Sequence, residues 1–156
     1  MLDFVSKFTN KEIKFYKLNN KYFLASPELD KCRLEQKEQF FGLYLGEDIN
    51  DQFVPAFGLL DWLSKYSNEK VFVKDIGEMD FLYGKSLRSR HILRVEGEKT
   101  IGFLKLIQNE YDENLGYGKI IGDFTKTEQV IKPKLDRGIF LKREKKDKRL
   151  SSESKR

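Results

Sequence analysis

The sequence is poor in the residues that carry most metal and redox chemistry. Its 156 residues include one cysteine and one histidine, which excludes an intrachain disulfide and a metal knuckle built from cysteine pairs. No apolar run approaches the roughly 20 residues that a membrane helix needs, and the opening stretch MLDFVSKFTN lacks the apolar core of a signal peptide. Because a lone cysteine is typical of reducing compartments, we expect a cytoplasmic protein with no cofactor, metal site or membrane contact.

Glycine motifs for nucleotide binding are also missing. Gly84-Lys85-Ser86 resembles the end of a phosphate-binding loop, but Met79 stands where that motif needs its first glycine. Gly116-Tyr117-Gly118 lacks the third glycine of a dinucleotide fingerprint and indicates a strand or turn. Carboxylates are plentiful, yet none has a recognisable acid/base or metal spacing. The sequence therefore predicts no catalytic residue.

What the chain has in excess is positive charge, and this excess lies in its second half. The formal net charge is +5, but residues 1–83 carry 11 Lys/Arg and 14 Asp/Glu whereas residues 84–156 carry 19 and 11. Residues 142–156 alone hold eight cations and three acids. Clustered cations gain free energy by releasing the counterions condensed on nucleic-acid phosphates, which favours an RNA-binding function. The alternative is a solvated tail that only keeps the protein soluble.

The first 25 residues predict a hairpin, and the residues after them a helix. Residues 13–18 and 21–25 are short aromatic-rich runs separated by Asn19-Asn20, a pair that tolerates positive φ. Ser26-Pro27-Glu28 has a capping hydroxyl, a first-turn proline and a first-turn acid, so we expect a helix from here to Gln39.

A strand and a second helix are predicted further along the first half. Residues 40–45 read as an apolar strand closed by Gly46. Large apolar side chains then recur at positions i, i+3, i+4 and i+7, which predicts a helix with all four on its buried face. They are Leu59, Trp62, Leu63 and Tyr66.

The pattern after Asn68 changes to short apolar runs separated by Gly, Asn and Asp, which favours a small β-barrel or sandwich. Strands are expected at 70–74, 100–108 and 118–121, and the last one, at 139–142, would point Ile139 and Leu141 into the core. A short helix is predicted over residues 85–92 with Leu87 and His91 on one side, so we interpret His91 as a packed residue rather than a base. Since no flexible linker follows Asn68, we expect two directly packed domains.

Basic residues surround the predicted short helix, Pro133 and the last predicted strand. Arginine offers a planar fork to phosphate or to a guanine edge, and lysine a mobile point charge. Sequence preference would need splayed bases, as in single-stranded or loop RNA. The candidate RNA contacts in these groups are Arg88, Arg90, Lys132, Lys134, Arg137, Lys142, Arg143, Lys145 and Lys146.

The stretch from residue 51 to residue 87 resembles the junction between the two domains of the Nip-seven family of ribosome-biogenesis proteins. In that family an apolar helix with an aromatic pair leads into a Lys-Val-aromatic strand and then a Phe-Leu-Tyr-Gly turn. The matching segments here are LDWL at 60–63, KVFVK at 70–74 and FLYG at 81–84. A weaker likeness extends over residues 21–26 and 136–144.

The resemblance implies an α+β protein: an N-terminal mixed α/β domain, 1–68, packed on a C-terminal PUA-like β pseudo-barrel, 69–144, with a basic flexible tail, 145–156. It implies a non-catalytic adaptor that binds pre-rRNA and other ribosome-assembly proteins during large-subunit assembly and rRNA processing. RNA contacts would include Lys142, Arg143, Lys145 and Lys146, and Gly84 would lie where the backbone closely approaches RNA. The chain length fits an archaeal member.

Two other functions stay open. In an RNA-modifying enzyme or its accessory subunit, the β-rich domain would deliver RNA to an active site in the first domain, and a concave pocket with converging polar groups would be found there. In a pure interaction scaffold, the basic tail would only solubilise the protein. In the RNA-binding factor, the acidic first half should repel RNA and is the part that we expect to bind protein partners.

Overall fold

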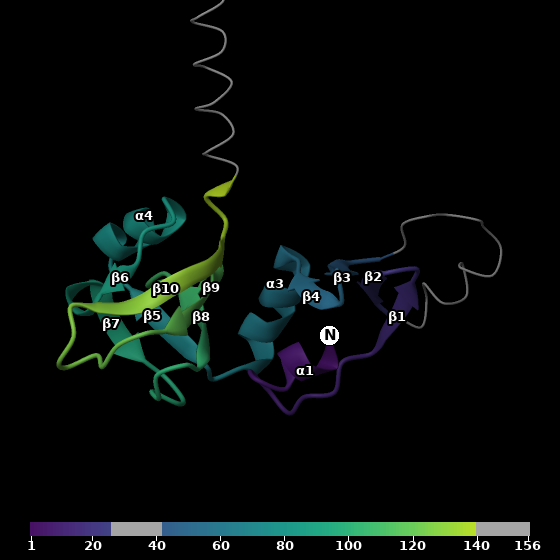
Figure 1. Cartoon of the computed structure of the whole chain (residues 1–156), viewed down its shortest axis with the longest axis horizontal. Coiled ribbons are helices and arrows are strands. Elements are labelled where there is room, and N and C mark those ends of the chain that lie inside the picture. The colour runs from purple at the N-terminus through teal and green to yellow at the C-terminus, as the bar shows by residue number, and fades with distance from the viewer. Residues whose placement is uncertain (26–41, 140–156) are drawn as a thin grey trace, which may run out of the picture. The chain divides into compact units, whose positions relative to one another are not determined.

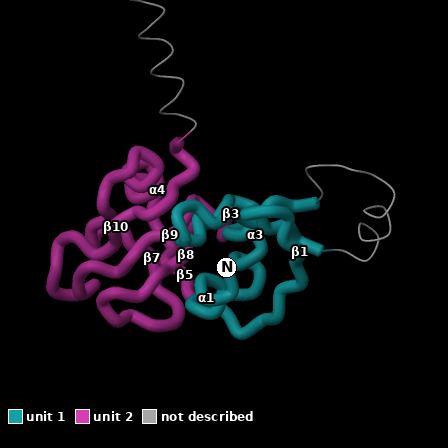
Figure 2. The backbone as a smooth tube through the Cα atoms, turned by 45° about the vertical axis from the view of Figure 1, so that its right-hand side comes forward, with its two compact units in different colours: residues 1–68 teal, residues 69–156 magenta. Residues whose placement is uncertain are grey.

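The computed structural model describes residues 1–25 and 42–139, and the chain divides into two compact units, residues 1–68 and 69–156 (Figures 1 and 2). The helix predicted after Ser26 lies outside the described residues, as do Lys142, Arg143, Lys145 and Lys146. Within the described ranges, no helix is long and apolar enough to cross a membrane.

The first unit contains an antiparallel sheet in the order β1-β2-β3-β4. The predicted hairpin is confirmed: β1 pairs with β2, and Asn19 has a φ of 55° in the turn between them. The prediction that Gly46 ends a strand is wrong, because β3 runs through it. A Cβ atom at Gly46 would lie 2.4 Å from the Val54 carbonyl oxygen of β4, so the close approach of the two backbones at this position requires glycine. The elements are α1 (Leu2–Val5), β1 (Phe15–Leu18), β2 (Lys21–Leu24), β3 (Tyr44–Ile49), β4 (Gln52–Pro55) and α3 (Phe57–Tyr66).

Helix α3 confirms the predicted helix but buries a different face. Leu59, Leu60 and Leu63 are fully buried, whereas Tyr66 is 47% exposed. Trp62 is half-buried, and its ring lies 4.8 Å from the ring of Tyr66. The aromatic pair therefore lies beside the buried stripe rather than within it, since leucines at i, i+1 and i+4 fill the core.

The second unit is a six-stranded sheet in the order β6-β10-β9-β8-β5-β7 (Figure 1). Only β5 and β8 pair in parallel, and every other neighbouring pair in this sheet is antiparallel. The elements are β5 (Lys70–Val73), α4 (Asp75–Leu82), β6 (Leu87–Arg88), the 3-10 helix η1 (Ser89–His91), β7 (Ile92–Val95), β8 (Leu104–Gln108), β9 (Asn114–Ile120) and β10 (Gln129–Asp136).

The sheet of the second unit curls into a nearly closed barrel. Its two edge strands, β6 and β7, follow each other in the chain and are joined by the three residues of η1, which brings the edges together. The predicted small β-barrel, and with it the α+β class, is confirmed. The two edges that remain are short, because β6 has two residues and β7 has four.

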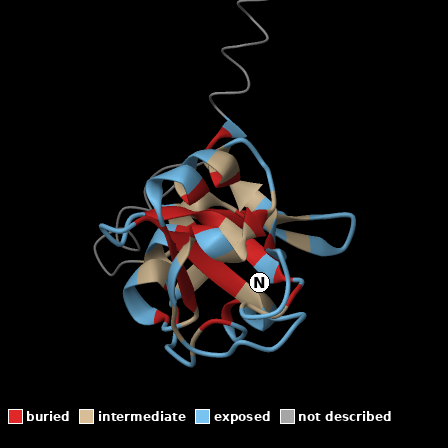
Figure 3. Ribbon diagram, turned by 90° about the vertical axis from the view of Figure 1, so that its left-hand side faces the viewer, coloured by how far each residue is buried: buried red, intermediate tan, exposed pale blue. Residues whose placement is uncertain are grey.

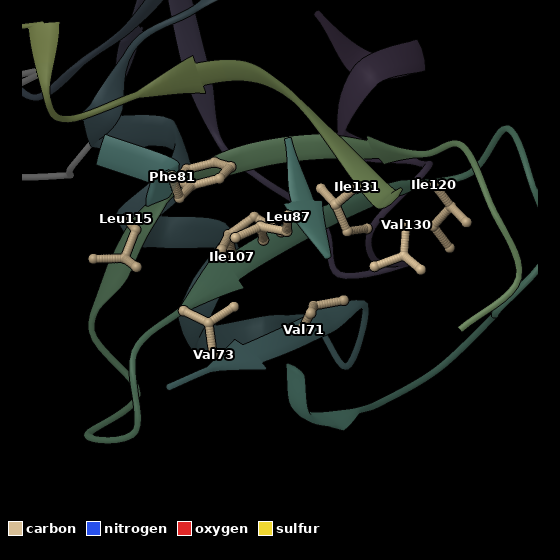
Figure 4. Packing of buried hydrophobic residues seen from close by; sticks show 9 residues of the cluster. All are labelled: Val71, Val73, Phe81, Leu87, Ile107, Leu115, Ile120, Val130 and Ile131. Carbon is tan, nitrogen blue, oxygen red and sulfur yellow. The ribbon is translucent and has the colours of Figure 1, made fainter. Parts of the chain in front are cut away.

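The barrel core is formed by aliphatic side chains from five strands and one aromatic side chain from α4 (Figure 4). Burial runs along the strands, while the connecting loops are exposed (Figure 3). The aromatic ring of Phe81 is fully buried and anchors α4 to this core. The other core residues are Val71, Val73, Leu87, Ile107, Leu115, Ile120, Val130 and Ile131.

Three sequence-based predictions for this unit are wrong. Residues 85–92 form β6, η1 and the start of β7 instead of a helix. Ile139 is 38% exposed and follows the last described strand instead of pointing into the core. That last strand is β10, which the sequence analysis missed because Pro133 interrupts a run of charged residues. Pro133 is tolerated because it lies beyond the short pairing with β6 and beside a bulge.

Candidate nucleic-acid interface

Gly84 ends helix α4 in a Schellman motif. The Gly84 N–H donates to the Phe81 carbonyl and the Lys85 N–H to the Asp80 carbonyl, the two bonds that define this motif. Gly84 has a φ of 76°, which favours glycine. The Lys85 side chain also donates to the carboxylate of Asp80, at 2.8 Å. The helix end with its positive φ therefore accounts for the glycine at position 84.

Arg88 and Arg90 lie together at the junction of β6 and η1. Arg88 forms an ion pair of 2.8 Å with Glu128, so its charge is already compensated. The Arg90 Nε atom lies 3.4 Å from Nε2 of His91. His91 is 2% exposed, and its Nδ1 accepts a hydrogen bond from the Arg88 N–H, which confirms the packed, hydrogen-bonded histidine. Burial lowers the His91 pKa, an effect opposed by the nearby carboxylate of Asp80.

The three remaining described candidates, Lys132, Lys134 and Arg137, lie on or just after β10. Lys132 and Lys134 are exposed, whereas Arg137 is half-buried. The Arg137 Nε donates to the Asn114 carbonyl at 2.7 Å, and its N–H donates to the Leu115 carbonyl. Arg137 therefore ties the end of β10 to the start of β9. Of these three candidates the two lysines are exposed, as is Arg90 at η1.

Sequence reasoning missed Lys119, which the structure places directly opposite Lys132. The two residues are Cα partners in the antiparallel pairing of β9 with β10, and both are exposed. Directly opposed residues of an antiparallel pair lie on the same face of the sheet. The alternation around Gly118 could have indicated that Lys119 faces outward, but only the register of β9 against β10 brings it to Lys132.

Acidic side chains gather elsewhere in this unit, around the start of α4. An open depression of about 310 Å³ is lined there by Asp75, Ile76, Leu93 and Glu110, together with Lys74. The hydrogen bond and charge of Asp75 raise the Glu110 pKa. Two carboxylates and one ammonium group line this depression, a balance of charge that repels phosphate.

The fold of this protein is that of PUA-domain proteins. A solved PUA-domain protein from Thermoplasma acidophilum superposes with a TM-score of 0.57 at 15% identity, covering 89% of this chain and 87% of that one. At this identity the likeness concerns the fold alone.

Residues 69–145 match the UPF0113 PUA domain, so this part of the chain is similar to that family. A UPF0113 protein of Archaeoglobus fulgidus is 27% identical over 119 residues, which cover 71% of this chain and 66% of that protein. The 60S ribosome subunit biogenesis protein nip7 of Schizosaccharomyces pombe is 34% identical over 59 residues, 38% of this chain and 33% of that protein. The matched regions span less than two thirds of either relative.

Proposed function

We propose that this protein is a non-catalytic RNA-binding factor in ribosome biogenesis, acting in large-subunit assembly and pre-rRNA processing. Its second unit binds RNA, and its first unit binds other assembly proteins. The PUA domain is a known RNA-binding fold, and the partial match to a 60S biogenesis protein supports the ribosomal role.

The observation that carries the proposal is the exposure of Lys132 and Lys134 on β10. Neither forms an ion pair within the part of the chain that the structure describes. Free ammonium groups on a sheet surface supply the sequence-independent share of RNA affinity, because each phosphate contact releases condensed counterions. In the sequence, residues 142–156 at the end of this unit carry eight cations, which add to the same attraction.

The rival function, an RNA-modifying enzyme, needs a pocket with converging polar groups in the first unit. An open depression of about 430 Å³ lies beside α1 there, lined by both polar and apolar side chains. The hydroxyls of Ser6 and Thr9 in its lining donate to the backbone carbonyls of Asp3 and Tyr66. Hydroxyls held in this way favour a structural role over catalysis.

The test is crosslinking of the full chain to RNA in its host cells, followed by sequencing of the recovered RNA. We expect enrichment of ribosomal precursor RNA from the parent and a strong reduction for the Lys132→Gln/Lys134→Gln variant. Lys7→Gln/Lys74→Gln is the matched control, because it also removes two exposed positive charges, at positions outside β10. Recovery of only background RNA from the parent, or turnover of recovered RNA into a modified product by the purified chain, would overturn the proposal.

A further inference from the structure

The pair Lys119 and Lys132 is an electrostatically unfavourable arrangement that the folded chain maintains. Directly opposed residues on antiparallel strands have Cβ atoms about 4.5–5.5 Å apart, and like charges at this position destabilise the sheet. Both side chains are exposed. A Cβ built at Gly102 would have the Lys119 Cε, at 4.0 Å, as its nearest neighbour, so the end of the Lys119 stem lies on the β8 side of β9.

Some other cations of the same unit are compensated by carboxylates, whereas Lys74, Arg90, Lys99 and Lys126 also form no ion pair within the described residues. Five cations have an acid partner within 3.0 Å, including the exposed Arg94 with Glu96 and the buried Lys105 with Glu69. Among the residues that the structure describes, Lys119, Lys132 and Lys134 form no such pair. The two acids in the connection between β9 and β10 have other partners. Asp123 accepts hydrogen bonds from Thr125, and Glu128 forms an ion pair with Arg88.

Lys134 brings a third ammonium group to this surface through a β-bulge. Pro133 pairs with Gly118 and Leu135 with Tyr117, so Lys134 is the extra residue of β10 and has no partner on β9. Bulges redirect a side chain and are common beside functional sites. Lys132 and Lys134 are also two residues apart along a strand, about 6.6 Å, so the three cations form a compact group.

From this geometry we propose that Lys119, Lys132 and Lys134, here named the lysine triad, are a binding site for the phosphate backbone of a single RNA strand. The inference rests on the proposed RNA-binding function and adds to it the site residue Lys119 and the ligand group. Consecutive phosphates provide partners for three ammonium groups that form no ion pair within the described residues. RNA binding therefore removes the repulsion between Lys119 and Lys132 and gains counterion release at the same time.

If the lysine triad binds phosphate, replacing one of its lysines should change both stability and RNA affinity, which is not expected for lysines that only face solvent. Lys119→Gln removes the repulsion in the free protein, so its Tm should rise by about 1–4 °C, from the size of cross-strand pair effects and their usual thermal consequence. The same change removes a phosphate contact, so RNA affinity should fall. At 0.15 M salt the loss is about fourfold, and the slope of log K against log salt becomes shallower by about 0.7.

The experiment uses the full chain and a fluorescent single-stranded oligouridine in anisotropy titrations across salt, together with thermal denaturation of the RNA-free protein. The variants are Lys119→Gln, Lys132→Gln and the double variant, with Lys119→Arg keeping the charge and Lys74→Gln as the matched control. We expect higher Tm and weaker binding for each single glutamine variant. We expect little additional gain in Tm for the double variant, because the repulsion is already removed by either change.

The outcomes separate this inference from the proposed function. If the parent binds the oligonucleotide but Lys119→Gln keeps its affinity and salt slope, the lysine triad is not the site, although the protein still binds RNA. A parent that binds no RNA overturns both proposals. A lower Tm for both single glutamine variants contradicts the repulsion argument, and the Lys132→Gln variant repeats the test if Lys119→Gln does not fold.

Discussion

Replacing Glu69 by glutamine should destabilise the second unit more than replacing its buried partner, Lys105. The Lys105 side chain is fully buried between β5 and β8, and its ammonium group donates to the Glu69 carboxylate and to the Glu96 carbonyl. The Glu69 side chain is 23% exposed and also accepts the N–H of Glu98. If its partner is removed, Glu69 can still be hydrated by solvent, whereas the buried Lys105 ammonium group cannot.

The expected magnitudes follow from what each change leaves behind. Glu69→Gln leaves a buried ammonium without a counter-charge, which costs about 3–5 kcal/mol of unfolding free energy. Lys105→Met leaves a partly hydrated carboxylate that keeps a backbone donor, at a cost of about 1–3 kcal/mol. The double variant Glu69→Gln/Lys105→Met should recover most of the loss, because replacing a whole buried pair is often neutral.

The pH dependence provides a second signature of the same pair. Burial lowers the Lys105 pKa below its usual 10.5, and the hydrogen bond that Lys105 donates to Glu69 opposes this shift. Between the lowered pKa and 10.5 the unfolded chain binds more protons than the folded one, so stability rises with pH through this interval. Glu69→Gln lowers the pKa further, so the rise should begin at a lower pH than in the parent.

The assay is urea denaturation followed by circular dichroism at several pH values from 7 to 10, with hydrogen exchange of the β8 amides to assign the change to this unit. Lys99→Gln, an exposed cation in the β7–β8 connection, is a control for the change in net charge. A loss below about 1 kcal/mol for Glu69→Gln, or a larger loss for Lys105→Met, would refute the reasoning.

Two further predictions concern the packing of α4 on the barrel. Gly77→Ala should destabilise the protein despite the better helix propensity of alanine, because the new Cβ would lie 2.8 Å from the His91 Cβ and 3.1 Å from the Val73 Cβ. We expect a loss of about 1–3 kcal/mol in unfolding free energy by urea denaturation, with Met79→Ala at an exposed position of the same helix as control. An unchanged or higher stability of Gly77→Ala would contradict this packing. Stability should also fall as pH drops from 6.5 towards the lowered pKa of His91, since the unfolded chain then binds the extra proton. The denaturation midpoint should therefore depend less on pH between 7.5 and 5 in His91→Gln than in the parent. The same pH dependence in parent and variant would show that His91 does not titrate in this way.

Local sequence signals predicted the elements whose pattern is complete within a few residues. The Asn19-Asn20 turn between two aromatic runs predicts the β1–β2 hairpin, and the KVFVK run predicts β5. The family resemblance, not a local signal, implied a turn at Gly84, and the structure has this glycine at the end of α4 with a φ of 76°. The short apolar runs after Asn68 similarly predicted a small barrel, since their length and spacing leave little room for helices.

The sequence alone determined the charge asymmetry of the chain and the β-rich character of its second half. The tertiary structure decided which cations share a surface: strand register placed Lys119 opposite Lys132, a bulge exposed Lys134, and Arg137 was drawn into a backbone hydrogen bond. It also decided that residues 85–92 complete the barrel instead of forming a helix, because η1 joins its two edge strands. Pairings between strands far apart in the chain depend on long-range packing and register, which local propensity does not encode.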